Sequence, residues 1–219
     1  LTAGPTAFAV LSAAEETRPT IYAQPEDKTI ECGAQAGSFT VRYTNAAGES
    51  VQESTLGLTG TAVYRTGYDS TQAAKRGVGT YAVTLSGQTS GSYFLVYRPG
   101  TLTVTPKTVS LTWSADTLPY TGALQTVTAA VNAADLLSGD AVTVSAYTGN
   151  TGTAAGSYTA QATALAGAAA ANYRLPANAA HAWKITTAAN SFVIQPAISG
   201  WIYGNAPSEP VASARFGTV

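Results

Sequence analysis

Short stretches in which apolar and polar residues alternate recur along most of the chain. Residues 38–43 read SFTVRY, which places Phe39, Val41 and Tyr43 on one face. Thr40 and Arg42 then lie on the other. An alternation with a period of two is typical of half-buried β-strands. Glycine and proline residues separate these stretches at close intervals, which favours sandwich strands joined by tight turns. The same alternation returns at 81–85, 101–105, 109–113, 142–144, 158–163 and 181–186.

One segment departs from this pattern. Residues 166–172 read AGAAAAN, a composition with high helix propensity. An isolated helix of this length does not offset the cost of helix nucleation. We therefore expect a single helical turn or a tight loop here.

Internal repetition is the most informative feature of the chain. The segment GTYAVTLSG that begins at Gly79 is followed by SYFL, and the segment GSYTAQATALAG that begins at Gly156, 77 residues later, is followed by NYRL. A closing strand follows each copy, at 100–105 and at 182–186. Glycine permits a tight turn, and a tyrosine buries its ring while its hydroxyl keeps a partner, so these residues are predicted to determine the fold.

Each copy is also expected to open with a tyrosine at a strand end, and Tyr22, Tyr120 and Tyr203 fit this pattern. A third copy then begins near Ala188 and holds about two strands. Because two strands cannot bury an apolar face unaided, we expect this partial copy to self-associate, by strand swapping or end-to-end addition. The predicted organisation is an extension at 1–17, β-sandwich modules at 18–106 and 107–187, and a partial repeat at 188–219.

The repeated segments resemble the Ig-like repeats of the MBG and YGX type, which occur in tandem in large bacterial surface proteins. The resemblance is carried by GTYAVTLSG, by SYFLVY with PGTLTVTP at 99–106, and by WIYGNAPSEP at 201–210, and it covers roughly residues 18–219. The second copy departs from the family pattern because Tyr120 is separated from its glycine by Thr121. The resemblance implies an all-β fold of tandem Ig-like antiparallel β-sandwich modules, described by strand and turn residues and without catalytic ones.

The function implied by the resemblance is structural. It implies an extracellular protein, secreted or on the bacterial cell surface, in which this region is a stalk of an adhesin-like protein and spaces a functional head from the cell envelope. Its partners would be the neighbouring repeats of the same chain. Two alternatives stay open: a module that binds carbohydrate or a host protein, and an accessory Ig-like region of a large secreted enzyme.

Composition excludes other classes. Only 11% of the residues are charged and the net charge is −1, so the clustered Lys and Arg excess of a nucleic-acid binder is missing. Hydrophobic residues make up 45% of the chain, enough for a packed core, but no apolar run approaches the roughly 18 residues that span a bilayer. We expect no nucleic-acid partner and no membrane insertion.

The side chains that usually carry chemistry are scarce. His181 is the single histidine; it could pair with a serine and an aspartate, but it shares a predicted strand face with Trp183 and is expected to be packed there. No zinc-type cluster, calcium-loop motif or glycine-rich phosphate loop is present, although Asp69, Asp116 and Asp140 stay open as calcium ligands. We expect no enzyme activity, no cofactor and no bound metal.

Two covalent cross-links are also considered. Cys32 stands three residues before Gln35, the spacing of an internal thioester, but a lone cysteine usually packs as a small apolar residue. Lys107 and Lys184 are candidates for Lys–Asn isopeptide bonds, which some bacterial surface Ig-like domains carry, but no accompanying buried carboxylate is identified.

Aromatic residues supply the remaining binding hypothesis. The chain has 12 tyrosines and three tryptophans, and tyrosine rings are favoured in recognition surfaces. Most occupy positions that match between repeats, where core or turn roles are expected. The tyrosines outside the clearest matches are the candidate contacts for a glycan or a host surface protein: Tyr64, Tyr68, Tyr97 and Tyr147.

Overall fold

The computed structural model describes residues 18–197, 202–206 and 211–216. The predicted extension at 1–17 and much of the motif at 201–210 lie outside the described residues. The chain divides into two compact units, Leu1–Lys107 and Thr108–Val219. Within the described residues the secondary structure consists of strands and short 3₁₀ helices, so the predicted all-β class is confirmed. The four-part organisation inferred from the repeats stays a prediction.

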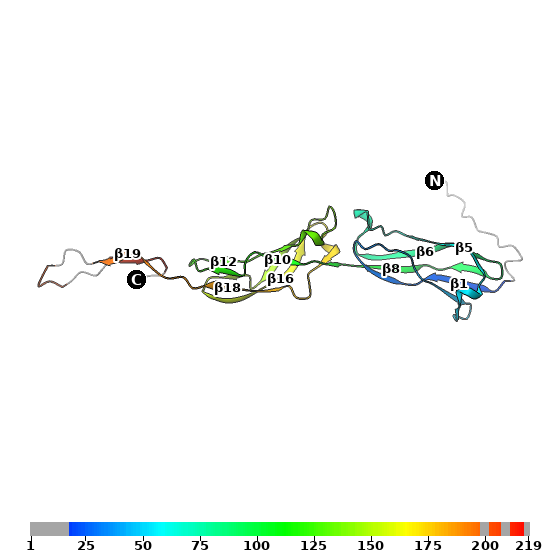
Figure 1. Ribbon diagram of the computed structural model, residues 1–219, viewed down its shortest axis with the longest axis horizontal. Coiled ribbons are helices and arrows are strands. Elements are labelled where there is room, and N and C mark those ends of the chain that lie inside the picture. Colours follow the sequence, from blue (N-terminus) through cyan, green and yellow to red (C-terminus); the bar gives the residue numbers. More distant parts are fainter. Residues whose placement is uncertain (1–17, 198–201, 207–210, 217–219) are drawn as a thin grey trace, which may run out of the picture. The chain divides into compact units, whose positions relative to one another are not determined.

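The first unit is a sandwich of two four-stranded sheets (Figure 1). In one sheet the order is β4-β3-β1-β7, with β1 (Thr20–Pro25), β3 (Val41–Asn45), β4 (Ser50–Val51) and β7 (Phe94–Tyr97). In the other the order is β2-β8-β6-β5, with β2 (Lys28–Glu31), β5 (Leu58–Thr66), β6 (Gly79–Ser90) and β8 (Gly100–Thr105). Two 3₁₀ helices lie in the connections, η1 (Glu53–Thr55) and η2 (Ala73–Lys75).

Side chains from both sheets form the core of this unit. Ile21, Ala23 and Tyr43 from the first sheet pack with Leu85 of β6 and with Leu56, which follows η1. All five are buried, and in β1 and β6 the buried side chains alternate with more exposed ones, as inward-facing strand positions require. The two sheets therefore enclose one apolar layer, and the predicted β-sandwich is confirmed for this unit.

The second unit contains a four-stranded sheet with the order β11-β18-β16-β14 and two-stranded pairs, among them β10-β13, β12-β15 and β17-β9. The sheet comprises β11 (Thr117–Pro119), β14 (Thr143–Thr148), β16 (Gly156–Ala166) and β18 (Ala180–Thr186). The pairs comprise β9 (Lys107–Thr108), β10 (Leu111–Trp113), β12 (Gln125–Thr126), β13 (Ala129–Val131), β15 (Thr151–Gly152) and β17 (Tyr173–Arg174). The 3₁₀ helices are η3 (Ala133–Asp135) and η4 (Ala170–Asn172); η4 is the single helical turn predicted at 166–172.

The last described strands, β19 (Phe192–Ala197) and β20 (Val211–Ala214), pair antiparallel in a sheet of their own. Large apolar side chains are exposed here, among them Val193, Ile194 and Ile202. Two strands alone cannot cover such a face. The self-association expected of this segment stays a prediction.

The sheets are not purely antiparallel, and this part of the predicted architecture is wrong. β1 runs parallel to β7 and β2 runs parallel to β8, because the opening segment leaves one sheet and joins the other. The crossing lies between Pro25 and Lys28, where the Glu26 amide donates to the Thr40 carbonyl and Asp27 accepts from the Thr101 amide. In the second unit β11 likewise runs parallel to β18.

Backbone pairing also corrects one predicted repeat match. The Cys32 amide donates to the carbonyl of Thr105 at the end of β8, and the Tyr120 amide donates to the carbonyl of Thr186 at the end of β18. Cys32 directly follows β2, which runs parallel to β8, and Tyr120 directly follows β11, which runs parallel to β18. Cys32 therefore stands in the first unit where Tyr120 stands in the second. The match of Tyr22 with Tyr120 is wrong, because Tyr22 belongs to β1, one strand earlier.

The third copy follows the corrected register. Gly33 stands eight positions after Pro25, and Gly204 stands eight positions after Pro196. Gly33 and Gly204 have φ values of 89° and 95°, a region that favours glycine. Tyr203 therefore occupies the position of Cys32 and Tyr120.

Candidate functional site

Repeat-equivalent tyrosines tie the start of a central strand to the preceding loop in both units. The Tyr81 hydroxyl donates to the carbonyl of Gly77 over 2.7 Å, and the Tyr158 hydroxyl donates to the carbonyl of Ala154, also over 2.7 Å. Each hydroxyl thus reaches back four residues along the chain, as in the tyrosine corner of Ig-like sandwiches. These two tyrosines have the same structural role in both copies, as the 77-residue repeat predicts.

Two of the candidate contact tyrosines use their hydroxyls inside the fold. The Tyr97 hydroxyl donates to the backbone carbonyl of Gln88 and accepts from the backbone amide of the same residue. The Tyr147 hydroxyl does the same with Ala129, at 2.9 Å from its carbonyl oxygen and 3.0 Å from its amide nitrogen. Both side chains are half-buried. Each bridges two strands through the backbone of one residue, so the polar group that a ligand would contact is already engaged.

The other two candidates belong to the first unit. Tyr68 is 5% exposed, and its hydroxyl accepts from the Gly33 amide and donates to the Ala34 carbonyl. Tyr64 is half-buried against the core and packs on Phe39 with ring centroids 5.6 Å apart. Burial raises the pKa of both phenols. All four candidates are buried or half-buried, and ligand contact by them stays a prediction.

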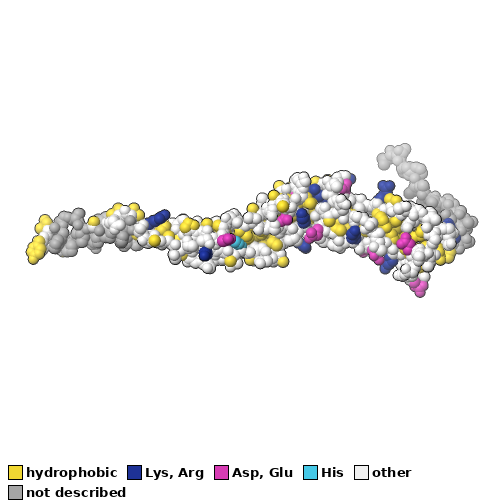
Figure 2. All heavy atoms as spheres, viewed as in Figure 1, with side chains coloured by type: hydrophobic (Ala, Val, Ile, Leu, Met, Phe, Trp, Pro, Cys, Tyr) yellow, Lys and Arg dark blue, Asp and Glu magenta, His cyan; other side chains and the backbone are white. Residues whose placement is uncertain are grey.

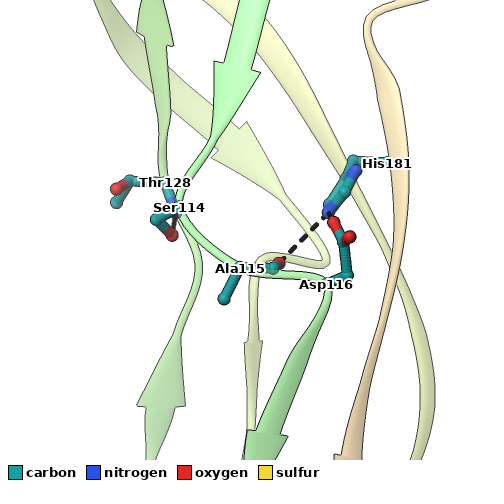
Figure 3. A network of polar contacts seen from close by, with 5 residues as sticks. All are labelled: Ser114, Ala115, Asp116, Thr128 and His181. Atoms are coloured by element: carbon teal, nitrogen blue, oxygen red, sulfur yellow. Dashed lines mark hydrogen bonds and ion pairs between the residues drawn. The ribbon is translucent and has the colours of Figure 1, made fainter.

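His181 lies in β18 on the same face as the buried Trp183, as predicted. Its ring stacks on Trp113 with centroids 4.9 Å apart and planes 8° apart. Nε2 lies 3.1 Å from the carbonyl oxygen of Ala115 and 3.1 Å from Oδ1 of Asp116 (Figure 3). The His181 side chain is 18% exposed and that of Asp116 is 85% exposed, so this pair joins a packed ring to a solvated carboxylate.

A catalytic triad is not assembled around this pair. Ser114 is close in sequence, but its hydroxyl accepts the Thr128 amide over 3.0 Å, and Figure 3 shows it turned to the other side of the segment from His181. A nucleophile must be within hydrogen-bond reach of its base. The arrangement therefore holds the segment between β10 and β11 against β18 and offers no activated hydroxyl.

The two residues considered for a thioester differ in burial. Cys32 is 2% exposed and its thiol donates to the Arg76 carbonyl over 3.1 Å, whereas the Gln35 side chain is exposed. A thioester requires Sγ to meet the side-chain carbonyl carbon of the glutamine. This placement gives the thioester no support, and it stays an untested prediction.

The lysines proposed for isopeptide bonds also differ in setting. Lys184 is exposed on β18, and Lys107 is half-buried in β9. An isopeptide bond forms between buried partners with a carboxylate beside them, and Lys184 does not meet the first condition. Both cross-links stay predictions.

Two of the aspartates considered as calcium ligands accept hydrogen bonds from different parts of the fold. Asp69 accepts from the hydroxyl and amide of Thr71, and these hydrogen bonds lower the pKa of its carboxyl. Asp140 accepts from the Tyr173 hydroxyl over 2.7 Å. Within the part of the chain that the structure describes, no three His, Cys, Asp or Glu side chains are grouped so that they could hold a metal ion.

The second unit has a hollow on its surface. It has a volume of about 500 Å³ and is lined by Trp113, Asp135 and Asn178 among others. Asp135 already accepts from the amide and the hydroxyl of Ser110, at 2.7 and 2.5 Å. On the face seen in Figure 2, the charged side chains of the described residues are scattered among uncharged ones, so this face shows no patch of one charge sign.

Comparison with known proteins finds one family match, and it lies in the first unit. Residues 20–103 match the family model of the MBG domain (YGX type). The match begins at the first residue of β1 and ends within β8, so it includes strands of both sheets. A search of curated proteins finds no match to the chain. No helix among the described residues is long and apolar enough to cross a membrane. The predicted resemblance is therefore confirmed for this part of the chain: residues 20–103 are similar to the MBG domain of the YGX type.

Proposed function

We propose that this chain is a non-enzymatic stalk region of a bacterial adhesin-like surface protein, and that its tandem modules space a functional head from the cell envelope. The observation that carries the proposal is that one tyrosine hydroxyl contact is repeated in the two units. Tyr81 and Tyr158 make the same hydroxyl contact at the start of β6 and β16. Repetition of a sandwich together with its anchoring contact lengthens a protein, which is what a spacer requires.

The use of the polar side chains supports the same proposal. Tyr97 and Tyr147 bond to backbone groups on other strands, and His181 stacks within the fold. These contacts hold strands together in sheets that are short of ion pairs, since only 11% of the residues are charged. Hydroxyl groups and aromatic rings therefore supply the specific contacts that charges supply elsewhere.

Surface labelling of the producing bacteria tests the location. An antibody against the first unit should label intact cells as strongly as permeabilised ones. Labelling that requires permeabilisation would contradict a surface stalk. A cytoplasmic marker detected with its own antibody is the control for intact envelopes.

A binding screen separates the stalk from the binding-module alternative. The purified chain, applied to a glycan array and a panel of host surface proteins, should bind nothing above a denatured control. A ligand whose binding is reduced by truncating Tyr64 or Tyr147 to alanine in a folded variant would instead favour the binding module.

A further inference from the structure

Phe216 of the partial third repeat packs against Tyr120, which follows β11 in the second. The two ring centroids lie 5.0 Å apart at an interplanar angle of 66°. A Cβ added to Gly122 would lie 3.3 Å from Cδ1 of Phe216, so the phenylalanine ring also covers this glycine. Edge-to-face geometry at this distance is the favoured arrangement of an aromatic pair.

The Phe216 backbone is held by the residues that directly precede β19. The Asn190 side-chain amide donates to the Phe216 carbonyl over 2.7 Å, and its oxygen accepts from the Phe216 amide over 3.0 Å. The neighbouring Arg215 amide donates to the Ser191 carbonyl over 2.9 Å. These three bonds orient the turn that follows β20, and with it the ring.

Tyr120 is a fixed platform for this contact. Its amide donates to the Thr186 carbonyl at the end of β18, and its side chain packs on the core cluster that contains Trp183 and Ile185. The β19–β20 hairpin, in contrast, has two strands and exposes Val193. A hairpin of this size is marginal without packing against another element. The contact therefore links a marginal element to a stable one.

We propose that Tyr120 and Gly122 form a docking platform for an aromatic residue in the turn after the second strand of the next repeat, here Phe216. The contact is a joint that limits the motion of one repeat against the other. It deepens the proposed stalk role, because a spacer keeps its reach only if its modules do not bend freely.

The chain contains a matched control for this joint. Tyr203 occupies the same place in the third copy as Tyr120 in the second, and it is 93% exposed. Replacing Tyr203 therefore removes an equivalent ring that is almost fully exposed. Tyr120→Phe retains the docking ring and removes only the hydroxyl.

Nuclear magnetic resonance on the full 219-residue chain tests the joint. In Phe216→Ala the ring-proton shifts of Tyr120 should move, and backbone amides of β19 and β20 should exchange with solvent about two- to tenfold faster, the range expected for loss of one aromatic pair. Tyr120→Ala should speed exchange at the same amides. Tyr203→Ala and Tyr120→Phe should leave this exchange at the wild-type rate.

The Trp183 indole signal shows in each variant that the second unit is folded. The joint is refuted if Phe216→Ala, in a folded chain, changes neither the ring-proton shifts of Tyr120 nor the amide exchange rates of β19 and β20. The joint is also refuted if Tyr203→Ala has the same effect as Tyr120→Ala. Neither result bears on surface location, which the antibody experiment decides separately.

Discussion

The hydroxyl contacts of Tyr81 and Tyr158 allow a paired test of the repeat architecture. Each is to be replaced by phenylalanine, which removes one hydrogen bond of 2.7 Å and keeps the ring, including the stack of Tyr158 on Trp183 with centroids 4.7 Å apart. A net intramolecular hydrogen bond contributes about 0.5–1.5 kcal/mol to the free energy of unfolding. The bond of Tyr81 is partly buried and that of Tyr158 is exposed. We therefore expect Tyr81→Phe to fall near the upper end of this range and Tyr158→Phe near the lower end.

The two units can be followed separately in one chain. The tryptophans, Trp113, Trp183 and Trp201, all belong to the second unit, whereas the first unit has none. Tryptophan fluorescence thus reports the second unit, and circular dichroism reports both. A loss of about 1 kcal/mol in a unit of this size lowers its melting temperature by about 4–8 °C.

Each substitution should affect its own unit. Tyr158→Phe should lower the melting temperature of the second unit, which tryptophan fluorescence detects. Tyr81→Phe should leave that temperature unchanged and lower the melting temperature of the first unit. Tyr203→Phe, at a side chain that is 93% exposed, is the control and should change neither. If Tyr81→Phe and Tyr158→Phe both leave their transitions unchanged, the hydroxyls do not anchor the loops and the argument from repeated contacts fails.

Gly100→Ala should destabilise the first unit by about 1–3 kcal/mol in urea titrations, because an added Cβ would lie 2.2 Å from the Pro25 carbonyl oxygen; an unchanged midpoint would contradict this packing. Asp116→Asn should cost less than about 1 kcal/mol, since its carboxylate is 85% exposed, whereas Trp183→Ala, which removes a buried indole, should cost about 3–5 kcal/mol in the same titration. Burial raises the folded-state pKa of Tyr68 above 10.0, so the stability it contributes is complete below the unfolded pKa and is lost as pH rises through the folded value. Melting temperatures measured in steps from about pH 9 upward should fall beyond about pH 10, and less so in Tyr68→Phe; equal profiles would exclude this phenol as the cause.

Much of the fold follows from local pattern. The alternation in β6 and β18 places Val83, Leu85, Trp183 and Ile185 inside, because successive side chains of a strand point to opposite faces. The helical turn η4 also follows from local propensity. The strand ends are less well predicted: β3 begins at Val41, not at residue 38.

The corrected register shows where local pattern is insufficient. Tyr22 and Tyr120 look alike in sequence, yet the amide of Cys32 has the same partner position as the amide of Tyr120. The equal spacing of eight residues from Pro25 to Gly33 and from Pro196 to Gly204 was a signal for this alignment that the tyrosines obscured. Parallel pairing of β2 with β8 joins residues more than 70 positions apart, so no local window contains it.

The sequence by itself determines the all-β class, the repeated segments and the scarcity of reactive side chains, because strand periodicity, turn glycines and composition are local properties. Only the tertiary structure decides what the polar and aromatic groups do. It brings Tyr147 to Ala129, His181 to Asp116 and Phe216 to Tyr120, over distances that range from 18 to 96 positions along the chain. The partner of a hydroxyl or a ring is the group that folding places beside it, and that group is chosen by sheet order and strand crossing.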